Sequence, residues 1–172
     1  MSLSARVIAH LERAGVPCAV IGGVALGAHG IARATLDTDV LVTDPTVLSA
    51  AFWPRRKTVP TPMIRRGAAD DPLVGVASLR TDGEQVDVVV GRGAWMAAML
   101  TRRIWAGTGR SKLPIVDRAD LVLLKLYAAG PQDLLDVRLL LQADRSALRR
   151  AVESRLPAAP RRLATVWRQL DD

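Results

Sequence analysis

The chain has 172 residues, of which 49% are hydrophobic and 24% are charged. This balance is typical of one globular domain with a proper core, and it excludes a disordered protein. No apolar run approaches the roughly 20 residues that cross a bilayer, and the N-terminus lacks the apolar block of a secretory signal. The single cysteine, Cys18, excludes an internal disulfide and is expected to be buried. We therefore expect a cytoplasmic protein with no membrane partner.

The formal charge of +7 is unevenly distributed along the chain. Residues 145–168 contain seven arginines but only one acid, Glu153. A surface this basic attracts polyanions such as RNA, DNA or an acidic partner protein. The alternative is an ordinary solvated helical face. Lysine is rare, so Lys125 within an apolar helical pattern is a candidate for a specific role.

The first third of the chain mixes helical and strand patterns. Apolar residues at helical spacing predict a first helix over 3–14, which Gly15 and Pro17 end. An apolar run predicts a strand over 18–22, and small residues then predict a short helix. The next elements are a strand over 37–42 and, after the turn residues Asp44 and Pro45, a helix near 46–53.

The middle of the chain predicts a long loop and a hairpin. Residues 54–72 are rich in proline and arginine and have no clear period, which predicts a loop. Its basic side chains would meet a polyanionic substrate or simply solvate the loop. Asp82-Gly83 lies between two β-rich runs, VGVASLR and QVDVVVG, and is typical of a hairpin turn. A helix over 93–104 and a short strand near 113–116 follow.

The last third predicts helices alone. Asp117 is a plausible N-cap for a largely apolar helix that ends near Ala129, and Gly130-Pro131 starts the next helix, which ends near residue 142. Two further helices are expected over 145–156 and 159–170. Trp167 lies in the apolar stripe of the last one and is expected in the core.

This order of elements predicts an α/β (α+β) fold. We expect a mixed sheet flanked by helices over residues 1–116, which would form the catalytic core. Residues 117–172 would form a helical C-terminal part that packs on the core as one compact domain.

The residues most informative for function lie between 19 and 42 and in one later strand. Gly22 and Gly23 end a strand and open a helix, where backbone N–H groups can approach phosphate oxygens. Asp37 and Asp39 project to one face of their strand, because the side-chain period of a strand is two. Asp87 adds a third carboxylate from another strand. Unpaired buried charge is costly, whereas Mg²⁺ binds carboxylates together with substrate phosphates, so these acids predict a divalent cation site.

Two sequence blocks resemble a known family. The run GGVALGAHGIARATLDTDVLV resembles the signature of DNA-polymerase-β-type nucleotidyltransferases, in which Gly-Gly or Gly-Ser precedes Asp-x-Asp by about a dozen residues. The run DRADLVLLKLYAAGPQDLLDVRL resembles a second block of small bacterial members related to abortive-infection toxins. The resemblance covers about residues 15–142, apart from 54–72, and implies the nucleotidyltransferase fold.

The resemblance also implies roles for the first-block residues. Asp37 and Asp39 would hold Mg²⁺ that bridges the triphosphate of a nucleotide such as ATP, and Gly22 and Gly23 would cradle its phosphates. Asp87 matches the third acid, a metal ligand or the base that activates the attacking hydroxyl.

The second block implies a helical half of the site. Lys125 would reach the triphosphate, and Asp133 matches the acid of that block, with Asp136 as a weaker candidate. The non-functional alternatives are that Lys125 extends to solvent and that Asp133, near the start of its helix, only interacts favourably with the helix dipole. Arg33 would contact a phosphate or pair with Asp37 or Asp39.

The function that these residues imply is Mg²⁺-dependent transfer of NMP from an NTP to an acceptor hydroxyl, an EC 2.7.7-type reaction. The toxin-like relatives imply RNA, such as a tRNA end, as acceptor, and a toxin that has an antitoxin protein as partner. One alternative is an antibiotic nucleotidyltransferase with a small-molecule acceptor. Another is an inactive protein of the same fold that binds a partner.

Overall fold

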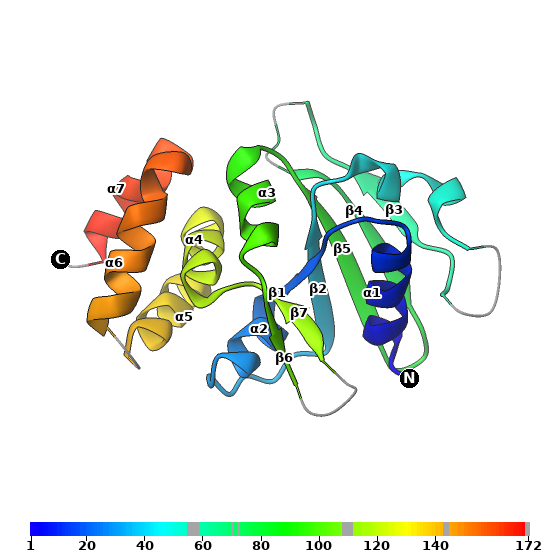
Figure 1. Ribbon diagram of the computed structural model, residues 1–172, viewed down its shortest axis with the longest axis horizontal. Helices are drawn as coiled ribbons and strands as arrows, with labels where there is room; N and C mark the ends of the chain where they lie inside the picture. The colour runs from blue at the N-terminus through cyan, green and yellow to red at the C-terminus, as the bar shows by residue number, and fades with distance from the viewer. Residues whose placement is uncertain (55–58, 70, 72, 108–111, 143–144, 171–172) are drawn as a thin grey trace.

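A seven-stranded mixed sheet with helices around it forms the frame of the computed structural model (Figure 1). The structure describes residues 1–54, 59–69, 71, 73–107, 112–142 and 145–170. The strand order is β3-β4-β5-β2-β1-β7-β6. The strands are β1 Ala19–Ile21, β2 Asp37–Val42, β3 Met63–Arg66, β4 Leu73–Arg80, β5 Gln85–Gly91, β6 Ile104–Ala106 and β7 Leu113–Ile115. The α/β (α+β) prediction is confirmed.

The centre of the sheet brings distant segments of the chain together. Strand β2 is antiparallel to β1 and parallel to β5, so it contacts both the start of the chain and the later hairpin. Strands β4 and β5 are antiparallel and joined at the predicted Asp82-Gly83 turn, which is confirmed. In this register Asp39 lies opposite Ile21 on one side and Asp87 on the other.

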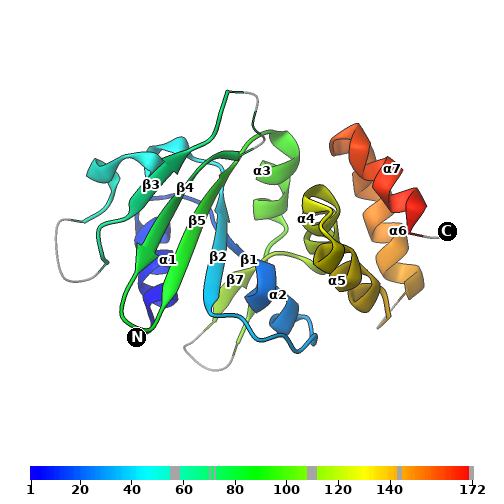
Figure 2. The same cartoon turned by 180° about the vertical axis from the view of Figure 1, so that it is seen from behind.

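One face of the sheet is covered and the other is open over β3, β4 and β5. Helix α1 (Leu3–Arg13) buries the apolar stripe of Leu3, Val7, Ile8 and Leu11 and contacts β5. On β5 the residues Val86, Val88 and Val90 are buried, whereas Gln85, Asp87 and Val89 are only half-buried. Figure 2 shows these strands with α1 behind them and no helix in front. Because side chains alternate along a strand, Asp87 belongs to the open face.

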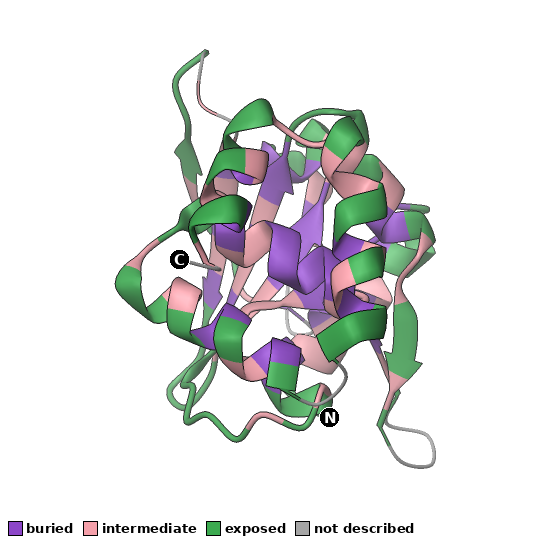
Figure 3. Ribbon diagram, turned by 90° about the vertical axis from the view of Figure 1, so that its left-hand side faces the viewer, coloured by how far each residue is buried: buried purple, intermediate pink, exposed green. Residues whose placement is uncertain are grey.

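The helices of the C-terminal part lie beside the sheet rather than on its open face (Figure 2). Helix α4 (Arg118–Ala128) contacts α5, α6 and α7, and most of its residues are buried. Figure 3, seen from the side of the last two helices, shows exposed outer helices over buried residues. The other helical elements are α2 Gly22–Ala28, α3 Ala94–Thr101, α5 Pro131–Gln142, α6 Arg145–Arg155 and α7 Arg161–Gln169, with short 3₁₀ segments at Pro45–Leu48, Ala50–Phe52 and Leu156–Ala158.

Several local expectations are confirmed. Asp117 caps α4 by accepting a hydrogen bond from the backbone N–H of Ala119. Trp167 is buried in the core. Cys18 is buried as well, and this burial raises the pKa of its thiol to about 12. None of the helices in the described part of the chain has the length and apolar character needed to cross a membrane.

Three local expectations are wrong. The loop predicted over 54–72 contains the edge strand β3, which pairs with β4. The helix predicted over 93–104 ends at Thr101, and the unexpected strand β6 follows it and pairs with β7. The helix predicted near 46–53 is instead two 3₁₀ segments separated by Ser49. Both missed strands are sheet edges that expose most of their side chains, so they lack the apolar alternation that marks a strand.

Candidate active site

Three carboxylates meet on the open face, where β2 and β5 run side by side. Asp39 and Asp87 occupy directly paired positions on these parallel strands, and Asp37 lies two residues before Asp39. Neighbouring strands are about 4.8 Å apart, and positions two residues apart share a face. The structure therefore brings together the three acids that the sequence singled out. Asp37 is exposed, whereas Asp39 and Asp87 are half-buried.

The charge of this cluster is only partly balanced. Burial raises the pKa of Asp39, the negative charges of Asp87 and Asp37 raise it further, and only Lys125 opposes them. Asp87 accepts a hydrogen bond at Oδ2 from the side-chain amide of Gln85, at 3.1 Å. Its Oδ1 atom is buried and has no hydrogen-bond partner among the described residues. Such a site favours a ligand that brings positive charge.

The donor set fits Mg²⁺ that is held jointly with a substrate. Among the residues that the structure describes, no group of three or more His, Cys, Asp and Glu side chains is arranged to hold a metal ion unaided. Mg²⁺ typically uses one or two protein carboxylates and completes its shell with waters and substrate phosphates. Asp37, Asp39 and Asp87 supply hard oxygen ligands of this kind, and the buried Oδ1 atom of Asp87 still lacks a partner.

The glycine pair has a structural requirement that concerns Asp39 directly. Gly22 has a φ of +66°, and a Cβ atom there would lie 2.2 Å from Oδ2 of Asp39. A Cβ atom at Gly23 would lie 2.9 Å from Cβ of Thr35. The backbone at the start of α2 thus approaches the carboxylate more closely than any side chain would allow. Whether these glycines also cradle phosphates stays a prediction.

The helical half of the predicted site forms one charged cluster. Lys125 Nζ lies 2.8 Å from Oδ1 of Asp133 and 2.8 Å from Oδ2 of Asp136. Only 12% of the Lys125 side chain is exposed, so the alternative that it extends to solvent is wrong. The charge of Lys125 also acts on the sheet, because it opposes the rise in the pKa of Asp39.

Asp136, the weaker candidate in sequence, is the centre of this cluster. Its side chain is 1% exposed and pairs with both Lys125 and Arg33. Burial alone would raise the pKa of Asp136, but the hydrogen bonds from Lys125 and Gln132, together with the positive charges of Lys125 and Arg33, hold that pKa below its ordinary value. The predicted pairing of Arg33 with Asp37 or Asp39 is wrong, because the described partner of Arg33 is Asp136.

Two side chains next to the carboxylates were missed in the sequence. Gln85 precedes Asp87 by two residues, shares its face and donates to it. Arg80 lies opposite Gln85 on β4 and donates from Nε to Oε1 of Gln85, at 3.1 Å. The alternation of QVDV could have placed Gln85, whereas Arg80 required the register of the hairpin.

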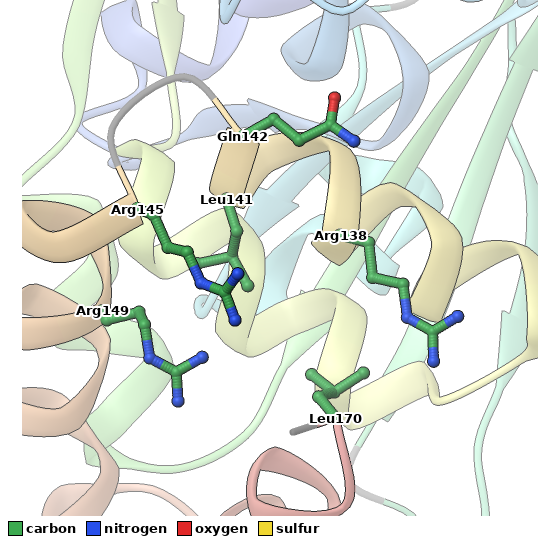
Figure 4. A pocket seen from close by; sticks show the side chains of 6 residues that line it. All are labelled: Arg138, Leu141, Gln142, Arg145, Arg149 and Leu170. Carbon is green, nitrogen blue, oxygen red and sulfur yellow. The ribbon is translucent and has the colours of Figure 1, made fainter. Parts of the chain in front are cut away.

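A separate basic pocket lies among the last helices (Figure 4). It has a volume of about 470 Å³ between α5, α6 and the end of α7. Three arginines line it, together with two leucines and a glutamine: Arg138, Arg145, Arg149, Leu141, Leu170 and Gln142. Two of these arginines, Arg145 and Arg149, belong to the basic stretch noted in the sequence, and none of the candidate carboxylates lines the pocket.

Comparison with known proteins supports the fold. No protein-family model matches the chain, and no curated protein does. Among solved structures, TM1012 of Thermotoga maritima, a protein assigned as a nucleotidyltransferase, gives a TM-score of 0.56 at 12% identity over 82% of this chain and 91% of that one. ANT(2")-Ia in complex with adenylyl-2"-tobramycin gives a TM-score of 0.53 at 15% identity over 89% and 96%. The chain has the nucleotidyltransferase fold.

The nucleotidyltransferase fold gives the two halves of the site their positions. The sheet places Asp39 and Asp87 on adjacent strands. Helices α4 and α5 bring Lys125 close enough to affect the ionisation of Asp39. At these sequence identities the likeness concerns the fold, so substrate and activity must be argued from the residues themselves.

Proposed function

We propose that the protein is a Mg²⁺-dependent nucleotidyltransferase, which moves NMP from an NTP to an acceptor hydroxyl on RNA. One observation carries the proposal. In a nucleotidyltransferase fold, Asp39 and Asp87 lie at paired positions of adjacent strands on an open sheet face, next to Asp37. Among the described residues, none of the three forms an ion pair.

The three carboxylates would hold Mg²⁺ together with the triphosphate of the substrate. When bound, the ion would stabilise the negative charge that develops on the attacking and leaving oxygens. Asp39 would gain from a bound cation, because its burial and its two acidic neighbours disfavour its ionised form. The buried Oδ1 atom of Asp87 suits either of two roles, a metal ligand or the acceptor of the hydroxyl proton.

The other site residues position and orient the nucleotide. Lys125 is a point charge fixed by Asp133 and Asp136, and it would attract the triphosphate beside the carboxylates. We assign Asp133 and Asp136 to positioning Lys125. Arg33 is tied to Asp136 but exposed at 36% of its side chain, so it retains donors for a phosphate. Gly22 and Gly23 would offer backbone N–H groups.

This assignment divides the chain by task. Residues 1–116 would supply the metal site and residues 117–172 would supply Lys125, its partners and the basic helices. The division is a proposal about function, and it follows from where the candidate side chains lie along the chain.

The choice of RNA as acceptor rests on charge. The chain carries +7, and arginines line the pocket between α5 and α7. Such surfaces attract nucleic acid phosphates. The toxin role and the antitoxin partner rest only on the sequence resemblance and stay predictions. The second candidate is a small-molecule acceptor, which the likeness to ANT(2")-Ia with its bound adenylyl-2"-tobramycin favours.

The test supplies labelled NTPs, Mg²⁺ and total RNA and follows label and pyrophosphate. We expect RNA to be labelled only with Mg²⁺. Asp39→Asn should lower the rate by about 10²–10³-fold, since it removes one preorganised electrostatic group. The matched control is Asp82→Asn in the exposed hairpin turn, which should leave the rate unchanged.

The alternatives give different results in the same assay. Labelling that ignores RNA but responds to an aminoglycoside would replace RNA with a small-molecule acceptor. Absence of any Mg²⁺-dependent NTP binding by calorimetry would support the inactive binding protein instead.

A further inference from the structure

A groove on the open sheet face continues the row of carboxylates across the sheet. It has a volume of about 410 Å³. Residues of β3 and β4 line it, with one residue just before β3 and the first residue of β5: Met63, Arg65, Ser78, Arg80, Thr61 and Gln85. The strand register puts Met63 opposite Ser78, and Ser78 opposite Asp87. The groove therefore lies in line with Asp87, on the side away from Lys125 and the helices.

The groove is positively charged. Its lining includes two arginines, Arg65 and Arg80, and no acid. Both are exposed, and neither forms an ion pair within the described part of the chain. Arg80 donates instead to a neutral partner, Oε1 of Gln85. Two guanidinium groups in one groove favour an anion, and they oppose a polycation such as an aminoglycoside.

A chain of hydrogen bonds links this charge to the candidate base. Arg80 donates to Gln85, whose amide nitrogen donates to Oδ2 of Asp87 at 3.1 Å. Residues that lie opposite one another on adjacent strands form a row across the sheet. Arg80 lies opposite Gln85, and Ser78 lies opposite Asp87, so Arg80 and Asp87 belong to neighbouring rows on the same face. Neighbouring rows on one face are about 7 Å apart along a strand. Groups attached to an anion that Arg80 binds would thus lie beside Asp87.

We infer that this groove binds the acceptor, and that the acceptor carries a phosphate group next to its free hydroxyl. The inference rests on the proposed nucleotidyltransferase function. Arg65 and Arg80 hold the phosphate, and the hydroxyl lies at Asp87. The hydroxyl proton passes to Asp87, the hydroxyl oxygen bonds to the α-phosphorus of the NTP, the bond from that phosphorus to the β-phosphate oxygen breaks, and pyrophosphate leaves. The 3′-terminal nucleotide of RNA and a free nucleotide share this chemistry.

The experiment measures binding first, so that it needs no turnover. A labelled triribonucleotide with a free 3′-hydroxyl is titrated by fluorescence anisotropy at fixed ionic strength, and AMP by calorimetry. Arg65→Gln and Arg80→Gln should each weaken binding by at least about tenfold. Arg13→Gln is the matched control, since Arg13 is exposed on α1 behind the sheet and should leave binding unchanged. A loss for both probes indicates a free nucleotide, and a loss for the triribonucleotide alone indicates an RNA end.

Arg65→Gln separates anion binding from the positioning of Asp87, because Arg65 makes none of the hydrogen bonds that reach Asp87. In the transfer assay it should raise KM for the acceptor and leave kcat and the affinity for NTP unchanged. Unaltered melting temperatures for both variants show that folding is intact.

Other outcomes overturn the inference. Equal binding by wild type and both variants would do so, as would no binding of either probe by the wild type, or tobramycin binding that strengthens in Arg80→Glu. NTP and Mg²⁺ binding is measured separately on the wild type. Absence of NTP binding contradicts the proposed function. If the wild type binds NTP but both arginine variants bind the acceptor probes as the wild type does, only the assignment of the groove is contradicted.

Discussion

The acids of the sheet and the acids of the helices have opposite surroundings. Among the described residues, the three sheet carboxylates have no ion pair, although Asp39 and Asp87 are half-buried. Every aspartate of the described part of α4 and α5, with the cap of α4, is paired with arginine or lysine: Asp117, Asp120, Asp133 and Asp136. Asp120 illustrates the difference, because it is fully buried and Arg102 binds both of its oxygens at 2.9 Å.

Within the described part of the chain, the helical acids have counter-ions, whereas the sheet acids do not. A buried carboxylate is tolerated when the chain supplies its counter-ion, as Arg102 and Arg155 do for Asp120. Asp39 and Asp87 have no ion pair within the described part of the chain, and in the proposed function a cation from outside the chain would balance their charge. Removing a helical acid should therefore destabilise the fold, and removing a sheet acid should remove function without loss of stability.

The largest expected effect on stability is at Asp136. Asp136→Asn leaves Lys125 and Arg33 without their shared buried counter-ion, so the free energy of unfolding should fall by about 3 kcal/mol. Asp87→Asn removes a charge without an ion-pair partner and should leave that free energy unchanged or higher. Urea denaturation of the two variants measures both. A loss of stability in Asp87→Asn as large as that in Asp136→Asn would remove the distinction between the two sets of acids.

A smaller effect is expected at the glycine beside Asp39. Gly22→Ala combines a left-handed backbone with a Cβ atom 2.2 Å from the carboxylate, so it should cost about 1–2 kcal/mol and weaken NTP binding. The matched variant is Gly27→Ala in the same helix, where an added Cβ meets nothing within 4 Å. It should raise stability by up to about 1 kcal/mol. Thermal denaturation with and without NTP and Mg²⁺ compares them, and equal effects would show that closeness to Asp39 is irrelevant.

Local patterns predicted most of the fold. Helical spacing marked α1 and the C-terminal helices, and Asp82-Gly83 marked the hairpin. The two edge strands were missed because their pairing depends on backbone groups of one neighbour, and their side chains are largely exposed. Ile64 is the only residue of β3 that is even half-buried, so β3 carries no alternation to read.

The site could be predicted to the extent that it is local in sequence. Asp37 and Asp39 share a strand, and their common face follows from its period. The partner of Arg33 could not be predicted, because Asp136 lies 103 residues away and the sequence offered only the nearby Asp37 and Asp39. Only the packing of α5 beside the 30–36 segment decides among them. Arg80 was missed for the same reason, since its role depends on strand register.

The smallest expected effect concerns the ionisation of Asp39 and sharpens the comparison at a single group. Burial, then the charges of Asp87 and Asp37, raise the pKa of Asp39, so the folded chain binds this proton more tightly than the unfolded chain. The contribution of Asp39 to the free energy of unfolding is therefore greatest at low pH. It is lost as the pH rises from the pKa of Asp39 in the unfolded chain through its pKa in the folded chain. Asp87→Asn should shift the Asp39 titration to lower pH, followed by ¹³C NMR of the carboxyl carbon.

The control for that titration is Asp44→Asn, because Asp44 caps a 3₁₀ segment after β2 and is not among the charges that shift Asp39. Mg²⁺ with NTP should also lower the pKa of Asp39 in the wild type, where it starts above its ordinary value, since the added cation favours the carboxylate. If Asp87→Asn left the pKa of Asp39 unchanged, the two carboxylates would not interact electrostatically. The paired strand positions would then bring together two independent acids rather than one cation site.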